Sequence, residues 1–133
     1  MRVIKVLVAL LATVTFFVLL AQTDADYMGW MKSAVASKGK VAKGIAAKDK
    51  GVATDAKVME DSFKGMEDYW TKKGVADATG FAKTARTASA DAAKAIAAGD
   101  FDAANAAMTT VGSTCGGCHM AHRAKGDSGY QIK

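Results

Sequence analysis

Two cysteines and two histidines lie in one short segment near the C-terminus, where Cys115, Gly116, Gly117, Cys118 and His119 are consecutive. On a helix, thiols three residues apart project to the same side, and His119, four residues after Cys115, joins them. A disulfide between residues so close in sequence could not hold distant parts of a domain together. The spacing therefore predicts a chemical role: a redox dithiol, a metal site or a covalent attachment site.

The C-x-x-C-H string is typical of covalent attachment of haem c. The two thiols bond to the vinyl-derived carbons of one haem edge, and His119 approaches the iron. The two small glycines keep bulk away from that edge. A thioredoxin-like dithiol is disfavoured because it needs a βαβ context. Zinc is disfavoured because Cys115, Cys118, His119 and His122 on one helix cannot easily surround a tetrahedral ion.

The elements that position this motif are expected to be helices. Alanine, lysine and methionine are frequent, proline is absent, and no leucine follows Leu20. No convincing period-two alternation occurs, so a sheet is not expected. Breaks at Gly and Asp clusters, with Asp100 as an N-cap, predict helices at residues 27–48, 52–73, 75–98 and 101–125.

Apolar residues three and four apart predict one buried stripe on each helix. With short connections, this favours an all-α, antiparallel up-down-up-down four-helix bundle. A core dominated by alanine buries little area, so a large planar ligand would stabilise it. The stripes are Val52, Ala56, Met59, Phe63, Met66 and Trp70; Phe81, Ala85, Ala88, Ala92 and Ile96; and Phe101, Ala104, Met108, Val111, Cys115, Cys118 and His122.

Residues 1–25 read as a signal peptide. Arg2 and Lys5 precede an uncharged apolar run, and small residues follow it, which predicts cleavage after Ala25. An uncleaved membrane anchor is the alternative. Either reading exports the domain of residues 26–133 to the periplasm. The chain has a net charge of +5, and its basic residues are scattered rather than clustered. This pattern excludes a nucleic-acid surface. It is compatible with docking to an acidic redox partner.

The mature chain resembles the class II c-type cytochromes, the four-helix-bundle family that includes cytochrome c′ and its low-spin relatives. The resemblance is carried by the haem motif in the last helix and by Arg123, which completes C-x-x-C-H-x-x-x-R and by family likeness lies beside the proximal histidine. His122 stands where the family commonly has an aromatic residue. It is too close to His119 to reach the opposite haem face.

The sixth iron ligand decides between functions. Both histidines lie on the last helix, so a strong distal ligand has to be methionine or, less plausibly, lysine. The resemblance implies a methionine of the first helix. Met31 is preferred because it shares a stripe with Tyr27, Ala34 and Ile45, and Met28 is the fallback.

We therefore expect an exported monohaem electron carrier rather than an enzyme, served by periplasmic redox partner proteins. A five-coordinate, cytochrome c′-like protein that binds NO or CO is the alternative. Contact with the membrane is expected only if residues 1–25 are retained, and the resemblance allows a homodimer. The aromatic residues expected to wall the haem are Trp30, Trp70, Phe63 and Phe101.

Overall fold

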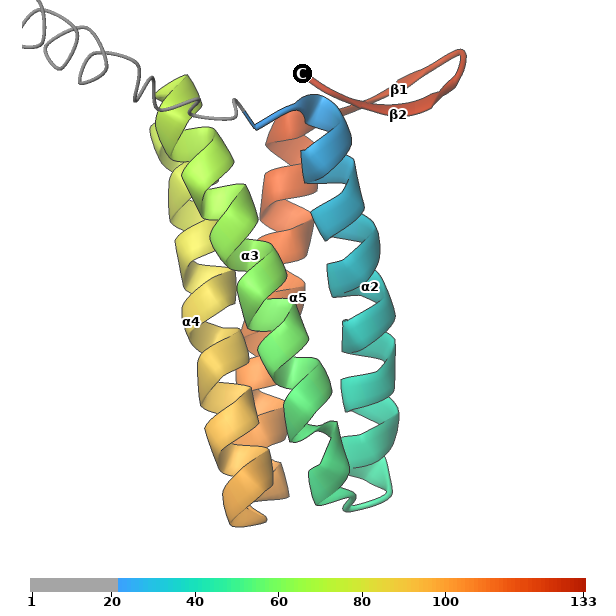
Figure 1. Ribbon diagram of the computed structural model, residues 1–133, viewed down its shortest axis with the longest axis vertical. Helices are drawn as coiled ribbons and strands as arrows, with labels where there is room; N and C mark the ends of the chain where they lie inside the picture. The colour runs from blue at the N-terminus through green and yellow to red at the C-terminus, as the bar shows by residue number, and fades with distance from the viewer. Residues whose placement is uncertain (1–21) are drawn as a thin grey trace, which may run out of the picture.

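The computed structural model describes residues 22–133, and the predicted signal peptide lies almost wholly outside them. Within the described residues the chain forms a bundle of four helices in which successive helices run in opposite directions (Figure 1). The predicted four-helix bundle is confirmed. The helices are α2 (Asp24–Ala46), α3 (Ala53–Lys73), α4 (Ala76–Ala98) and α5 (Phe101–His122), and a short 3-10 helix, η1 (Lys50–Val52), precedes α3.

Local signals account for most helix ends. Asp100 caps α5, as predicted, by accepting a hydrogen bond from the Ala103 amide at 2.9 Å. The α3 and α4 helices end at Gly74 and Gly99, whose φ angles of 70° and 80° lie in the left-handed region that favours glycine. Most of the predicted boundaries are therefore correct to within one or two residues.

The start of α2 differs from the prediction, because the helix begins at Asp24 rather than Tyr27. Thr23 and Asp26 form a reciprocal capping box: the Thr23 hydroxyl accepts from the Asp26 amide at 3.1 Å, and the Thr23 amide donates to the Asp26 carboxylate at 2.8 Å. The Asp24 carboxylate accepts a hydrogen bond from the Tyr69 hydroxyl at 2.5 Å. Cleavage after Ala25 would remove this cap and the Asp24 contact.

The expected stripes form the core. Most of the buried residues of α4 are alanines, and Ile96 is the one large aliphatic side chain among them. Small side chains allow α4 to lie close to both α3 and α5, which keeps three of the four helices tightly packed. The largest side chains with almost no exposure are Tyr69, Met59, Met66, Ile96, Val41 and Val111.

The main difference from the predicted fold lies at the C-terminus. The last helix ends at His122 instead of residue 125, and a hairpin follows, in which β1 (Arg123–Gly126) pairs antiparallel with β2 (Gly129–Ile132). Two residues, Asp127 and Ser128, connect the strands between glycines, a turn signal that outweighed the helical pattern. The hairpin folds back so that the Lys133 amide donates to the His122 carbonyl at 3.1 Å.

Candidate functional site

A cleft separates α2 from α5, which touch each other sparsely, whereas the other neighbouring helices pack along their lengths. It consists of three adjoining pockets of about 20, 530 and 180 Å³. Met31 of α2 and His119 of α5 line all three. These two side chains therefore mark the centre of the cleft from opposite walls.

The motif on α5 faces this cleft. Cys115, Cys118 and His119 all line the smallest pocket. Cys115 also lines the largest of the three, the groove, and Cys118 also lines the pocket beside the hairpin. Both cysteines are free and half-buried. Since a helix turns about 100° per residue, the three side chains span one arc of α5, as the sequence predicts. All three reactive groups thus point into one space.

The two glycines between the cysteines have different surroundings. A Cβ atom at Gly117 would lie 2.7 Å from Cε1 of Phe81 on α4, whereas one at Gly116 would meet nothing within 4 Å. Gly117 lies on the side of α5 turned away from His119. It therefore lets α5 rest against α4, and this contact helps to fix the rotation that aims the motif at α2.

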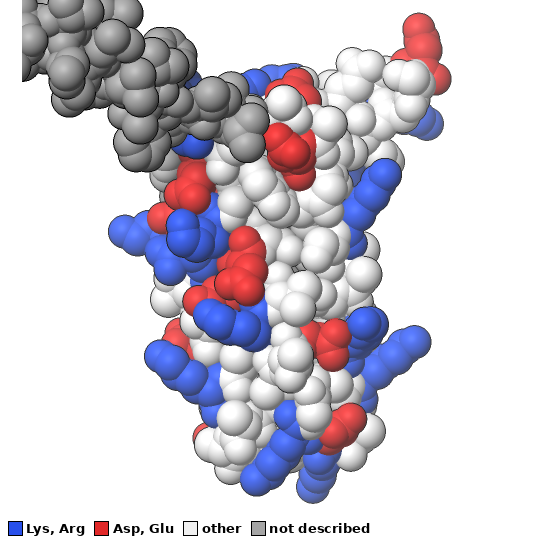
Figure 2. Space-filling view, viewed as in Figure 1, with Lys and Arg blue, Asp and Glu red and all other residues white. Residues whose placement is uncertain are grey.

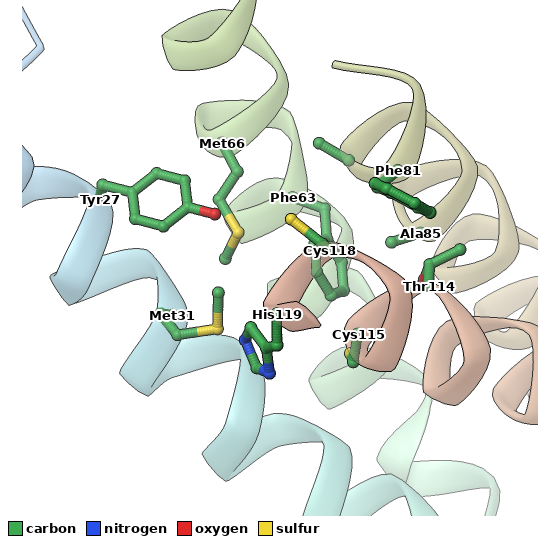
Figure 3. A pocket seen from close by; sticks show the side chains of 11 residues that line it. Tyr27, Met31, Phe63, Met66, Phe81, Ala85, Thr114, Cys115, Cys118 and His119 are labelled. Atoms are coloured by element: carbon green, nitrogen blue, oxygen red, sulfur yellow. The ribbon is translucent and has the colours of Figure 1, made fainter. Parts of the chain in front are cut away.

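The two methionines of α2, on the wall opposite α5, differ in the pockets that they line. Figure 3 shows the Met31 thioether and the His119 ring pointing toward one another from α2 and α5. Met28 lines two pockets beside the hairpin, one of which His119 also lines. Met31 therefore shares all three pockets of the cleft with His119, whereas Met28 shares one of them.

Of the four aromatic residues expected to wall the cleft, only Phe63 lines it. Trp30 packs over Gly65, where a Cβ atom would lie 2.5 Å from the indole ring, and Trp70 is buried in an aromatic cluster. Helical periodicity identifies buried positions but not which side of the bundle core opens into a cleft. The lining side chains that were not expected there include Met66, Phe81, Lys38, Tyr130 and Ile132.

An aromatic cluster adjoins the cleft at Tyr27, which lines two of its pockets. The Trp70 indole donates to the Tyr27 hydroxyl at 3.1 Å, and the Tyr27 ring lies 4.8 Å from that of Tyr69. Burial raises the pKa of Tyr27 to about 12, so the phenol is neutral at ordinary pH. His122 packs on Trp70, with ring centroids 5.1 Å apart, and its Nε2 lies 2.8 Å from an Asp77 oxygen. His122 is thus held as a packed imidazole turned toward α4.

Burial also sets the protonation of the motif. It raises the pKa of the Cys115 thiol, an effect partly opposed by the nearby Lys38 charge. Burial likewise raises the pKa of the Cys118 thiol, and a hydrogen bond with Tyr27 opposes this effect in part. The pKa of His119 is lowered, first by burial and then by the Arg123 charge. At neutral pH the thiols are protonated and the imidazole is neutral, with a nitrogen lone pair available to a metal.

Arg123 lines the pocket beside the hairpin together with His119, although it begins β1 rather than continuing the helix. Its guanidinium stands 3.8 Å from the centre of the Tyr130 ring, a cation–π contact between the two strands. The hairpin therefore holds the arginine at the edge of the cleft.

Among residues 22–133 no three His, Cys, Asp or Glu side chains converge on a point where they could hold a metal ion. His119 and Met31 instead place an imidazole and a thioether on opposite walls of the cleft (Figure 3).

No protein-family model matches this chain, and neither a curated protein nor a solved structure is significantly similar to it. In the part of the chain that the structure describes, no helix is long and apolar enough to cross a membrane. The function must therefore be inferred from the site itself.

Proposed function

We propose that this protein is an exported monohaem c-type cytochrome that carries single electrons, with haem c attached to Cys115 and Cys118 and its iron bound by His119 and Met31. The observation that carries the proposal is the pairing of Met31 with His119 across the same cleft into which both thiols of the C-G-G-C-H motif point.

The residues present suit such a group. The largest pocket, at about 530 Å³, lies within the range of about 300–1,000 Å³ that small-molecule and cofactor sites occupy. Its walls are mostly apolar, with Phe63, Met108 and Ala34 among them. A bound haem c supplies a one-electron couple at its iron.

Side chains of this chain supply the ligands and the apolar walls of the site. His119 offers a neutral imidazole because burial and Arg123 lower its pKa. Met31 offers a thioether, a soft donor that favours the reduced metal. Apolar side chains such as Met66 and Phe63 line the smallest pocket and exclude water from it. A low-dielectric, packed environment of this kind resists rearrangement when a charge is added or removed.

The alternative is a five-coordinate protein that binds NO or CO, in which Met31 only covers the distal side. An enzyme such as a peroxidase is not proposed, because both histidines lie on α5 and no second histidine faces His119. Peroxide turnover by the purified protein far above that of free haem would contradict this part of the proposal.

The test is an absorption spectrum of the purified, exported protein, oxidised and then reduced, with and without carbon monoxide. We expect a low-spin reduced spectrum that is indifferent to the gas. Met31→Ala should yield a high-spin protein that binds carbon monoxide, while Met28→Ala, the matched control, should behave like the parent. If the parent already binds the gas and Met31→Ala changes nothing, the gas-binding alternative is correct. Absence of covalently held haem would overturn both.

Export is part of the proposal and has a separate test. The protein should be recovered from the periplasmic fraction, with residues 1–25 or a closely similar segment missing from its measured mass. Retention of the full mass in the membrane fraction would instead support the uncleaved anchor.

A further inference from the structure

The charges of the molecule are divided between its faces. On α3 and α4 carboxylates accompany the cations, some of them in ion pairs, as in Lys64–Asp68 at 3.1 Å and in the Arg86–Glu67 pair. In Figure 2 cations and carboxylates are interspersed over these helices, and along the α2 edge cations project with fewer carboxylates among them. The scatter of basic residues along the sequence thus becomes an asymmetry in three dimensions.

The mouth of the cleft is positive on one rim and uncharged on the other. Residues 27–46 of α2 contain lysines but no Asp or Glu, and residues 103–122 of α5 contain no Asp, Glu, Lys or Arg. On α2, Lys38 lines the groove. Lys32 and Lys43 are exposed and lie about 20° and 40° around the helix from Gly39, which also lines the groove. None of these three lysines takes part in an ion pair among residues 22–133, in contrast to Lys40, which pairs with Asp55.

The uncharged rim on α5 permits close approach. Its exposed residues are small or polar, and Asn105 and Thr109 line the groove directly. Two exposed large apolar side chains, Val35 on α2 and Met120 on α5, are 61% and 83% exposed. A partner could contact this face without burying an unpaired carboxylate of this chain.

We propose that this face, defined by Lys32, Lys38 and Lys43 along the cleft mouth, is the docking surface for an acidic redox partner protein. The inference rests on the proposed function, because the cleft mouth is where electrons would enter or leave a bound cofactor by the shortest route. Complementary charge steers such encounters and sets their orientation more than it adds affinity.

An anionic membrane surface is the alternative partner for a positively charged face. Helices that lie on membranes bury large apolar residues such as Trp, Phe and Leu. Here both tryptophans of the described chain are turned elsewhere: Trp70 is buried, and Trp30 packs on Gly65. The face therefore fits a protein partner better than a lipid one.

The first test maps the surface without relying on electron transfer. A polyglutamate peptide is coupled to the exported protein with a carbodiimide, and the cross-linked lysines are identified by mass spectrometry. We expect Lys32, Lys38 and Lys43 to dominate over Lys72, Lys83 and Lys94, which are exposed on α3 and α4 and also lack ion pairs. An even distribution over all these lysines would overturn the proposal.

The second test uses two small oxidants and reductants of opposite charge. The triple variant Lys32→Gln, Lys38→Gln, Lys43→Gln should react with anionic ferricyanide about three- to tenfold more slowly and with cationic hexaammineruthenium faster, and both differences should shrink at high salt. The control triple variant Lys72→Gln, Lys83→Gln, Lys94→Gln has the same net charge and should keep the parent rates. Equal effects in the two variants would show that only net charge matters and would refute the surface.

The outcomes separate this inference from the proposed function. A protein without covalent haem would defeat the proposed function and, with it, the redox role of the surface, whatever the cross-linking map shows. A haem-loaded protein with an even map would defeat only the docking surface. Sedimentation with phosphatidylglycerol vesicles that depends on the same three lysines would assign the face to a membrane instead.

Discussion

Replacing Gly117 by alanine tests how α5 is held against α4. The added Cβ atom would lie 2.7 Å from Cε1 and 3.0 Å from Cζ of Phe81, against an ordinary carbon–carbon contact of about 3.5–4.0 Å. The ring is half-buried and borders a pocket of about 20 Å³ next to Cys118, so relief of the contact requires the ring or α5 to move. We expect an overpacking cost of about 1–3 kcal/mol.

Gly116→Ala is the matched control. Both glycines lie inside α5, so both substitutions gain the same helix propensity of about 0.5–1 kcal/mol. A Cβ atom at Gly116 meets nothing within 4 Å. The difference in unfolding free energy between the two variants therefore isolates the contact with Phe81, and both variants keep the C-x-x-C-H pattern intact.

The assay is urea unfolding of the two variants and the parent, followed by helix circular dichroism. Gly116→Ala should be neutral or slightly stabilised, and Gly117→Ala should be about 1–3 kcal/mol less stable than Gly116→Ala. In a Phe81→Ala background the cost of Gly117→Ala should disappear, since the clashing ring is gone. Equal stability of the two alanine variants, or a cost that persists without Phe81, would refute the account of how α5 is oriented.

The remaining predictions concern α2 and its neighbours. Tyr27→Phe should cost about 1–3 kcal/mol in urea unfolding because the buried Trp70 indole loses its acceptor; a variant as stable as the parent would show that this hydrogen bond does not matter. In a chain that begins at Gln22, Thr23→Ala should cost about 0.5–2 kcal/mol through loss of the N-cap. A chain that begins at Asp26, the predicted mature start, should likewise melt below the chain that begins at Gln22; equal melting temperatures in calorimetry would show that the first turn is dispensable. The pKa of Asp24 is lowered from 3.8 by the Tyr69 hydroxyl and then by Lys73, so its contribution to stability is present above pH 3.8 and is lost as the pH falls through its lower, folded value. In the chain that begins at Gln22, Asp24→Asn should therefore flatten the acid side of the melting curve against pH, and an unchanged acid limb would contradict the assignment.

The helices could be predicted from the sequence because their signals are local. The stripe from Ala56 to Trp70, the Asp100 cap and the glycines after α3 and α4 each act within a few residues. The hairpin was missed because its turn signal, Asp127 and Ser128 between glycines, follows directly on a helical pattern. Hydrogen bonding of the Lys133 amide back to the His122 carbonyl is a contact that no local periodicity reveals.

The arrangement of the cleft could be predicted only in part. The C-G-G-C-H spacing indicates which face of α5 carries chemistry, and the stripe of Tyr27 and Met31 indicates the facing wall. Which aromatic residues border the cleft depends on how the helices are rotated and spaced, and Trp30 is drawn onto Gly65 of α3 instead. Such packing choices involve pairs of residues on different helices, so they lie beyond what one helix's pattern determines.

The alanine core and the cleft have a common physical origin. Alanine on α4 brings α3 and α5 close to that helix, and the bulkier side chains of α3, such as Phe63 and Met66, then reach toward the space between α2 and α5. A bundle packed tightly on three sides concentrates its remaining volume on the fourth, between Met31 and His119. The same separation leaves the α2 lysines without carboxylate neighbours across the groove. The composition that makes the core small thus produces both the site where a cofactor would bind and the positive mouth through which a partner would reach it.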